Sequence, residues 1–309
     1  MTTTTVKTKP GLASRLVNGV LAIKPLADLA KNRARNMMIE RAETIGVPWR
    51  ENVRQLRSHD WETELSQVED PNLSYPDYYV CSFHAYEKGN LDWEAALEVE
   101  SAAYSVHSTI WTGKKAPDAK GDPMLRESYH RVLKEKIATP PKDIVDLGCS
   151  VGMSTFALQE TYPEATLTGV DLSPYFLAVA NYRSRNRNLN VIWKHTAAEN
   201  TGLPDASYDL VSACLMFHEL PQKAAREIFA EARRILRSGG HFTIMDMNPQ
   251  SEIYAKMPPY ILTLLKSTEP YLDQYFTLDI EQALIEAGFE SVSITCNSPR
   301  HRTVVAKVK

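Results

Sequence analysis

Residues 144–153 read Ile-Val-Asp-Leu-Gly-Cys-Ser-Val-Gly-Met, and this stretch decides the fold. A short apolar run leads into a loop in which small residues stand at Gly148, Ser150 and Gly152. Small side chains let a backbone pass close to a ligand and turn tightly into a helix. The stretch therefore predicts a strand, a ligand-binding turn and a helix, which together form one unit of a parallel α/β sheet.

The acidic residues around this turn indicate what kind of ligand it holds. A dinucleotide-binding loop reads G-x-G-x-x-G and places a pyrophosphate at the helix N-terminus. Here Asp146 precedes the loop, where a carboxylate would repel a pyrophosphate but suit a cationic amino-acid group. Asp171 follows 19 residues after Gly152, at the end of the next predicted strand, where it can accept from both hydroxyls of a ribose. These features describe a nucleoside without a diphosphate, and S-adenosyl-L-methionine fits them.

Strands and helices alternate along the second half of the chain. We expect strands at residues 144–147, 167–170, 191–193, 210–214, 242–245, 292–296 and 303–308. We expect helices at residues 153–162, 174–185, 221–237 and 280–287. Ser173 supplies an N-cap and Pro174 a first-turn proline for the second of these helices. Such alternation predicts a parallel sheet covered on both faces, and the short turn between the last two strands makes that pair antiparallel.

Four segments in this order resemble motifs of the class I S-adenosylmethionine-dependent methyltransferases. They are residues 144–153, 167–174, 198–211 and 235–242. The resemblance covers roughly residues 123–309, and within the family it is similar to the ubiquinone and menaquinone C-methyltransferases. It implies a Rossmann-like, seven-stranded and mostly parallel sheet with an antiparallel last strand. Residues 1–122 would form a mainly helical, aromatic-rich N-terminal extension, joined by a linker at residues 112–122.

The resemblance also implies which residues bind the cofactor. Asp146 lies near the methionine ammonium, and the loop below the methionine part carries Gly148, Ser150 and Gly152. The nucleoside side is formed by Asp171 at the ribose, Leu172, Ala198 and Glu199 at the adenine, and Leu215, which closes the pocket. Two positions depart from the family pattern. Ser150 replaces the usual middle glycine, and Ala197 stands where many relatives place an aspartate that accepts from the adenine amino group, so Glu199 is the alternative acceptor.

His218 is the candidate catalytic residue. Methyl transfer from a sulfonium is an in-line displacement in which the protein mainly aligns the two partners. An acidic hydroxyl acceptor would also need a general base, and His218 follows the fourth predicted strand, at the edge where ligands bind. The alternative is a structural histidine that opens the next helix.

The substrate-binding candidates are Tyr275, Arg300 and His301. Arg300, His301 and Arg302 form the turn between the last two strands, where guanidinium groups would suit a carboxylate or a phosphate. Tyr275 belongs to residues 254–276, an aromatic-rich stretch that we interpret as a lid. Together with the nine aromatic residues of positions 61–111, this lid could enclose an apolar, ring-bearing acceptor. A solvated turn and a plain packed core are the competing interpretations.

The composition disfavours several other classes of protein. The net charge is −3, whereas nucleic-acid-binding domains are usually strongly basic. Residues 1–60 hold 11 Lys or Arg and 5 Asp or Glu, and the apolar spacing of residues 11–45 is helical. This segment is either a solvated helix or a peripheral membrane contact. Four scattered cysteines without a CxxC pair favour a reducing, cytoplasmic setting and no metal site.

The most favoured function is thus methylation of a small-molecule acceptor at oxygen or carbon. Two alternatives stay open: a catalytically silent S-adenosylmethionine-binding protein, and a methyltransferase that acts on a macromolecule. A nicotinamide-dependent oxidoreductase is disfavoured because the diphosphate-binding loop is missing. The sequence does not reveal the oligomeric state.

Overall fold

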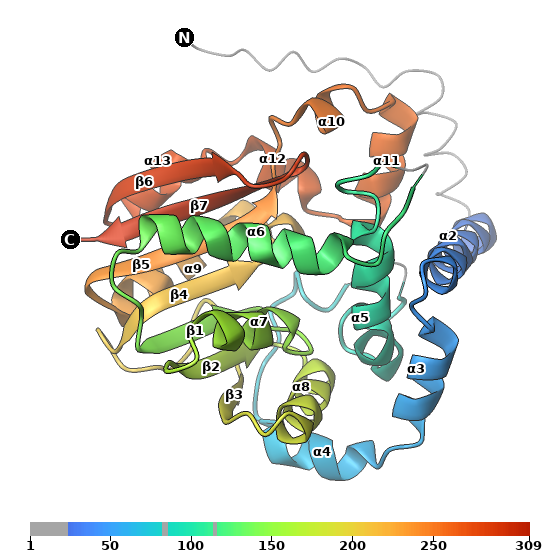
Figure 1. The fold of residues 1–309 in the computed structure, drawn as a ribbon, viewed down its shortest axis with the longest axis horizontal. Helices are drawn as coiled ribbons and strands as arrows, with labels where there is room; N and C mark the ends of the chain where they lie inside the picture. The colour runs from blue at the N-terminus through green and yellow to red at the C-terminus, as the bar shows by residue number, and fades with distance from the viewer. Residues whose placement is uncertain (1–23, 82–85, 114–115) are drawn as a thin grey trace.

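The computed structural model describes residues 24–81, 86–113 and 116–309, and its centre is a seven-stranded sheet (Figure 1). The strands are β1 (Asp143–Leu147), β2 (Thr166–Asp171), β3 (Val191–His195), β4 (Tyr208–Cys214), β5 (Leu236–Met247), β6 (Phe289–Cys296) and β7 (His301–Val308). Their order is β3-β2-β1-β4-β5-β7-β6, and only the β5–β7 and β7–β6 pairs are antiparallel. The predicted Rossmann-like sheet with an antiparallel last strand is confirmed.

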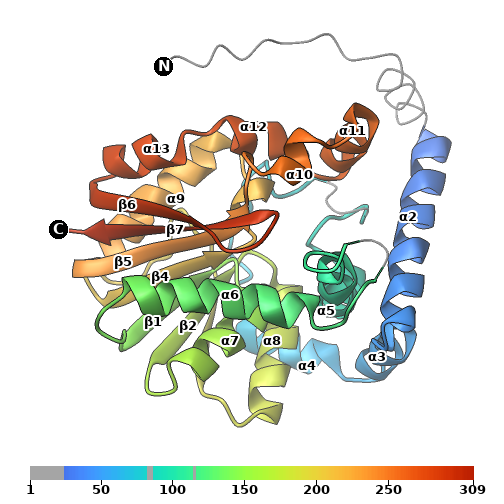
Figure 2. The ribbon, with the colours of Figure 1, turned by 45° about the horizontal axis from the view of Figure 1, so that its top comes forward.

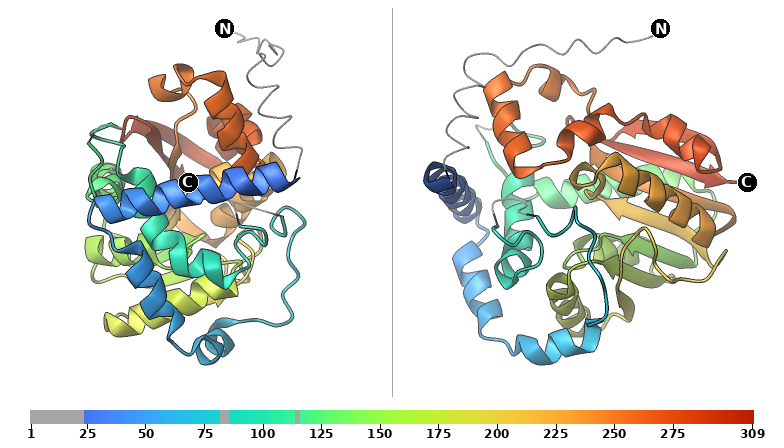
Figure 3. Two further views of the ribbon diagram at one scale, coloured as in Figure 1. Left: turned by 90° about the vertical axis from the view of Figure 1, so that its right-hand side faces the viewer. Right: turned by 180° about the vertical axis from the view of Figure 1, so that it is seen from behind.

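Helices cover both faces of this sheet. Those of the sheet domain are α6 (Gly121–Lys136), α7 (Met153–Thr161), α8 (Pro174–Asn186), η1 (Phe217–Glu219), α9 (Gln222–Ile235), α10 (Glu252–Ala255), α11 (Pro259–Thr268), α12 (Leu272–Thr277) and α13 (Ile280–Glu286). In β1, Ile144 packs in the same cluster as residues of α6 and α7, whereas Val145 packs with residues of α9 and α13. This alternation follows from the two-residue period of a strand. Figure 3 shows α9 and α13 on the face opposite α6.

The N-terminal extension wraps around the open end of the sheet domain. It consists of α2 (Lys24–Thr44), α3 (Trp49–Arg57), α4 (Trp61–Val68) and α5 (Trp93–His107). Figure 2 shows α2 along the outer side of the molecule, beside α5. Arg35 of α2 pairs with Glu98 of α5, and Glu64 of α4 pairs with Arg185 of α8. The extension is thus anchored on the sheet domain through α8, on the side towards which the parallel strands point.

Three predictions made from the sequence are corrected by the structure. The helix predicted to reach residue 237 ends at Ile235, and Leu236 already pairs with Tyr208 as the first residue of β5. Gly121 and Asp122 belong to α6 and not to a linker. The aromatic residues Trp61 and Trp93 pack against α8 and not around an acceptor site.

Residues 11–23 of the predicted basic helices lie outside the described residues, while α2 begins at Lys24. Within the part of the chain that the structure describes, no helix is long and apolar enough to cross a membrane. The division of the chain near residue 122 stays a prediction.

Candidate active site

Asp146 is the innermost polar group of the candidate cofactor site. It lies on β1, fully buried, and its Oδ2 accepts from Ser154 Oγ at 2.6 Å and Thr155 Oγ1 at 2.7 Å. Its Oδ1 is also buried and has no hydrogen-bond partner among the described residues. Burial raises the pKa of Asp146 to about 6, against the opposing effect of Ser154, Thr155 and Arg126. A buried carboxylate oxygen without a donor would be satisfied by a cationic amino group.

The loop after β1 has the backbone conformation that its small residues predict. Gly148 and Gly152 have positive φ angles of 65° and 85°, and Ser150 has 49°. A Cβ on Gly148 would lie 2.5 Å from Met216 Sδ, so a larger residue would displace this side chain and would also strain the backbone at a positive φ. Ser150 is a non-glycine residue in the left-handed region, which is uncommon and concentrates at functional sites. Its Oγ is buried and has no hydrogen-bond partner within residues 24–81, 86–113 and 116–309.

Asp171 ends β2 and holds this loop in place. One carboxylate oxygen accepts from the backbone N–H of Ser150 at 2.7 Å, and the other accepts from that of Ser173 at 2.8 Å. Burial raises the pKa of Asp171 to about 6, although both backbone hydrogen bonds lower it. A carboxylate has about four lone-pair sites, so two stay available for ribose hydroxyls. Asp171 is therefore both a clamp of the loop and a candidate ribose ligand.

The predicted adenine side lies next to Asp171. Leu172 and Ala198 are buried, and Glu199 accepts a hydrogen bond from Tyr78 Oη. The second carboxylate oxygen of Glu199 is buried without a partner, and burial raises the pKa of this residue. A free acceptor at this position fits the proposal that Glu199, in place of the missing aspartate, accepts from an adenine amino group.

Residues 69–81 of the extension lie across this edge of the sheet, which the sequence did not indicate. The backbone N–H of Asp70 donates to His195 Nδ1 at 2.9 Å, and Ser173 Oγ donates to the carbonyl of Asn90 at 2.7 Å. Tyr79 is buried, and the Asp171 charge is among the causes that raise its pKa, after burial itself. The extension therefore forms one wall of the candidate cofactor site.

Leu215 and His218 follow β4 at the same edge. Leu215 has a φ angle of 59°, and its N–H donates to the carbonyl of Met245 at 2.8 Å. His218 lies in η1, and its Nδ1 is 2.7 Å from Asp246 Oδ1, while its backbone N–H donates to Asp246 Oδ2 at 3.2 Å. The carboxylate fixes the imidazole ring and leaves Nε2 as the nitrogen that can act on another group. Asp246, near the end of β5, was missed by the sequence analysis.

This pairing changes the acid–base behaviour of His218. Burial lowers the pKa of His218, but the charge and the hydrogen bond of Asp246 raise it by more, and Glu269 and Glu219 add to the rise. The result is a pKa of about 10. The pKa of His218 in the ligand-free protein thus lies well above the value near 6.5 of an ordinary imidazole. At neutral pH this imidazole carries a proton.

Each of the three substrate-binding candidates is held by a different contact. Tyr275 is buried, and its hydroxyl donates to the carbonyl of Met247 at 2.7 Å. Arg300 is half-buried and donates through Nη2 to the carbonyl of Val106 at 3.4 Å. His301 is buried, with Nδ1 2.8 Å from Ser298 Oγ and its ring 6.0 Å from that of His107. Arg302, the other guanidinium group of the predicted turn, belongs to β7, and its guanidinium carbon lies 5.8 Å from the centre of the Tyr275 ring.

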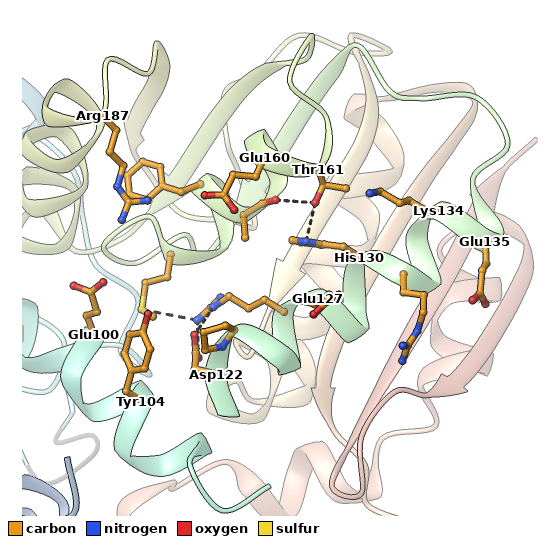
Figure 4. Close-up of a pocket in the computed structure, with 16 residues that line it drawn as sticks. Glu100, Tyr104, Asp122, Glu127, His130, Lys134, Glu135, Glu160, Thr161 and Arg187 are labelled. Atoms are coloured by element: carbon orange, nitrogen blue, oxygen red, sulfur yellow. Dashed lines mark hydrogen bonds and ion pairs between the residues drawn. The ribbon is translucent and has the colours of Figure 1, made fainter. Parts of the chain in front are cut away.

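A groove of about 750 Å³ opens between α5, α6 and α7, away from these residues (Figure 4). Its lining side chains carry both charges, including Glu127, Lys134 and Glu160. His130 is held there by Thr161 Oγ1 at 2.9 Å, and burial lowers its pKa to about 4. The mixed charge gives this groove no evident ligand.

Comparisons with known proteins show what the sheet domain is similar to. Residues 144–240 match the family model of the methyltransferase domain. Malonyl-[acyl-carrier protein] O-methyltransferase from Hahella chejuensis is 38% identical over 154 residues, which are 50% of this chain and 50% of that protein. Ubiquinone biosynthesis O-methyltransferase from Saccharophagus degradans is 28% identical over 171 residues, covering 54% of this chain and 70% of that protein. The chain thus spans about half the length of the Hahella relative.

A solved structure shows the same fold. It is a Nostoc punctiforme protein provisionally described as an O-methyltransferase, with a TM-score of 0.50 and 19% identity. The match covers 60% of this chain and 57% of that one.

Residues 144–240 of the chain thus form a methyltransferase domain. The residues at this edge of the sheet fit S-adenosylmethionine as the cofactor. Three buried polar atoms at this edge of the sheet have no partner among the described residues: Asp146 Oδ1, Ser150 Oγ and Glu199 Oε2. We propose that Asp146 Oδ1 faces the ammonium group, Ser150 Oγ the methionine part and Glu199 Oε2 the adenine amino group of that cofactor.

Proposed function

We propose that the protein transfers a methyl group from S-adenosylmethionine to an oxygen of a small-molecule acceptor. The observation that carries this proposal is the His218–Asp246 pair, 2.7 Å apart, at the same sheet edge as Asp146 and Asp171. The bound cofactor supplies an activated methyl group. The residues of the chain then need to align the acceptor, and alignment can supply roughly 7–11 kcal/mol of the barrier.

His218 is the proposed general base. Its Nε2 would take the proton from an acidic hydroxyl, which adds a factor of about 10²–10⁴. A cationic ligand beside η1 would lower the pKa of His218 from about 10 towards the working pH, because like charges disfavour the protonated form. Asp246 would keep the ring oriented through Nδ1, as a carboxylate does in other histidine-based sites.

The acceptor class is proposed from two features. The two relatives named above are O-methyltransferases by name, one acting on a malonyl thioester and one in ubiquinone biosynthesis. Residues 254–276 supply apolar surface near Asp246, with the rings of Tyr254 and Phe276 5.3 Å apart. An apolar, ring-bearing or acyl acceptor fits this environment. C-methylation would need no oxygen base, so the role of His218 separates the two reactions.

The test is a transfer assay with methyl-labelled S-adenosylmethionine and a panel of phenols, quinols, free carboxylic acids and a malonyl thioester. A small nucleic acid and a protein extract are tested as macromolecular acceptors. Labelled product from a small acceptor supports the proposal. If the protein binds the cofactor but methylates none of these acceptors, it is a silent binding protein. If it methylates only the nucleic acid or the protein extract, the assignment of a small-molecule acceptor is wrong.

The pKa of His218 gives a prediction that needs no acceptor. In Asp246→Asn the charge that raises the pKa is lost while burial remains, so the imidazole should titrate near or below its ordinary value of about 6.5. The native protein should titrate near 10. The measurement is the pH dependence of the imidazole resonances in NMR, with His218→Ala to assign them. Equal titration in both forms would show that Asp246 does not control this histidine.

We also propose that the protein is cytoplasmic and contacts a membrane surface through residues 11–45. In the described part, α2 exposes Leu29 and Met37, which are 65% and 55% accessible, and Arg33 lies between them on the same face. An apolar stripe with basic residues suits an anionic bilayer.

This contact is testable without deleting α2, which packs on α5 through Ile39 and Ala42. The double variant Leu29→Glu/Met37→Glu should lose most sedimentation with phosphatidylserine vesicles. Ile192→Glu, an equally exposed apolar site on β3, should behave as the native protein. Equal sedimentation of all three forms, or none by the native protein, would remove the membrane contact.

A further inference from the structure

Arg302 is a buried cation without a carboxylate partner. It lies on β7, directly opposite Asp246 in the β5–β7 register, and is 7% exposed. Its Nε has no hydrogen-bond partner, and among the described residues its guanidinium forms no ion pair. Buried charges in proteins are normally paired, because an unpaired charge is costly to remove from water.

Asp246, the carboxylate opposite Arg302 in the sheet, is hydrogen-bonded to other groups. Asp246 accepts from His218 Nδ1 and from the backbone N–H of His218, and its Oδ1 also accepts from the N–H of Met247 at 2.7 Å. Its hydrogen bonds therefore come from His218 and Met247, and no ion pair joins it to Arg302 among the described residues. The ring of Tyr275 lies 5.8 Å from the guanidinium carbon and limits its orientation. Tyr275 is itself fixed by the carbonyl of Met247.

His301, beside Arg302 on β7, and Arg300, in the turn before this strand, make other contacts. His301 points to the opposite face of β7, as the two-residue period requires, and meets His107. Arg300 is half-buried and donates through Nη2 to the carbonyl of Val106 on α5 at 3.4 Å. Arg302, whose Nε is buried without a hydrogen-bond partner among the described residues, therefore lies opposite Asp246, the carboxylate that holds His218.

We propose that Arg302 binds an anionic group of the methyl acceptor, a carboxylate or a phosphate, and that it sets the distance between this group and the accepting oxygen at His218. The inference rests on the proposed function, since it describes the acceptor half of the same site. A planar guanidinium held against an aromatic ring is suited to bidentate recognition of either anion. The structure thus assigns an acidic acceptor in place of a purely apolar one.

The first test measures stability without any ligand. Arg302→Met keeps the apolar stem and removes the unpaired charge, so the thermal midpoint should be unchanged or higher. Arg126→Met is the matched comparison, because Arg126 is a buried arginine that pairs with Asp122 at 2.9 Å, and it should lower the midpoint. A loss of more than about 4 °C in Arg302→Met, as expected for a structural arginine in a chain of this size, would overturn the proposal.

The second test measures binding to the protein loaded with S-adenosylhomocysteine. Benzoate and phenyl phosphate represent the two anions, and benzamide is the neutral control. At least one anion should bind the native protein, and Arg302→Gln should weaken it by about ten-fold or more, as for a lost charged hydrogen bond. Arg302→Lys should restore part of the affinity, and Arg226→Gln on the surface of α9 should behave as the native protein.

The outcomes distinguish an error in the proposed function from an error in the role of Arg302. S-adenosylhomocysteine affinity should be equal in all forms. If that ligand fails to bind, the proposed function is wrong. If it binds but the anions bind no better than benzamide, or bind Arg302→Gln as well as the native protein, only the role of Arg302 is wrong. Preference for benzoate or for phenyl phosphate decides between a carboxylate and a phosphate acceptor.

Discussion

Asp171→Ala should weaken S-adenosylmethionine binding by about 1.5–3 kcal/mol and also lower the stability of the ligand-free protein. The carboxylate accepts from the N–H groups of Ser150 and Ser173, and both donors lose their partner in the variant. The loop after β1 would then no longer be held in the left-handed conformation that Ser150 adopts. Calorimetry with S-adenosylmethionine and thermal unfolding measure the two effects.

Asp171→Asn is the matched control for this prediction. It preserves the volume and one acceptor oxygen but places an amide N–H₂ against one of the two backbone donors. We expect intermediate stability and weakened cofactor binding. Unchanged affinity in both variants would remove Asp171 from the cofactor site and leave it as a loop clamp only.

His218→Ala should lower turnover by about two orders of magnitude or more, with cofactor affinity nearly constant. The reason is that the imidazole lies at the acceptor side and its Nδ1 is held by Asp246, so its loss removes a base and not a cofactor contact. The measurements are initial rates with the acceptor found in the transfer assay, and calorimetry with S-adenosylmethionine.

The pH dependence distinguishes a base from a structural histidine. The pKa of His218 is raised to about 10, with Asp246, Glu269 and Glu219 as the charges that raise it. A base is protonated below its pKa, so the native rate should rise with pH up to the pKa of His218 in the cofactor complex, which the cationic cofactor lowers below about 10. His218→Ala should lack this ionisation. If the variant keeps most of its activity, or loses activity and cofactor affinity together, the histidine is structural.

Much of the sheet domain could be predicted because its local signals agree with one another. Small residues at 148, 150 and 152, an N-cap at Ser173 and alternating apolar runs each indicate the same fold, and the N-cap hydrogen bond from Phe176 N is present. The end of α9 could not be predicted. Leu236 continues the apolar period of the helix and is buried in the structure, yet it pairs with Tyr208 in β5. A periodic pattern does not show where a helix gives way to a strand when both face the same core.

Some residues of the candidate site could likewise be predicted from the sequence, and others could not. Asp146, Gly148 and Asp171 follow from a local motif, so their positions could be predicted. The contact of Tyr78 with Glu199 joins residues 121 positions apart, and no pattern in the sequence connects them. Asp246 had a usable signal, since it directly follows the apolar run of residues 242–245, at the end of a parallel strand where ligands bind. The position of Arg302 opposite Asp246 could not be predicted, because it depends on the register between β5 and β7.

The most direct test of the central assignment is calorimetric titration of the native protein with S-adenosylmethionine, and in parallel with NAD. The account predicts binding of one S-adenosylmethionine per chain, with a dissociation constant in about the micromolar range, and no binding of NAD. Asp146→Ala should reduce that affinity, since Asp146 Oδ1 is the buried acceptor proposed for the ammonium group. A folded native protein that binds NAD, or that leaves S-adenosylmethionine unbound, would contradict the account.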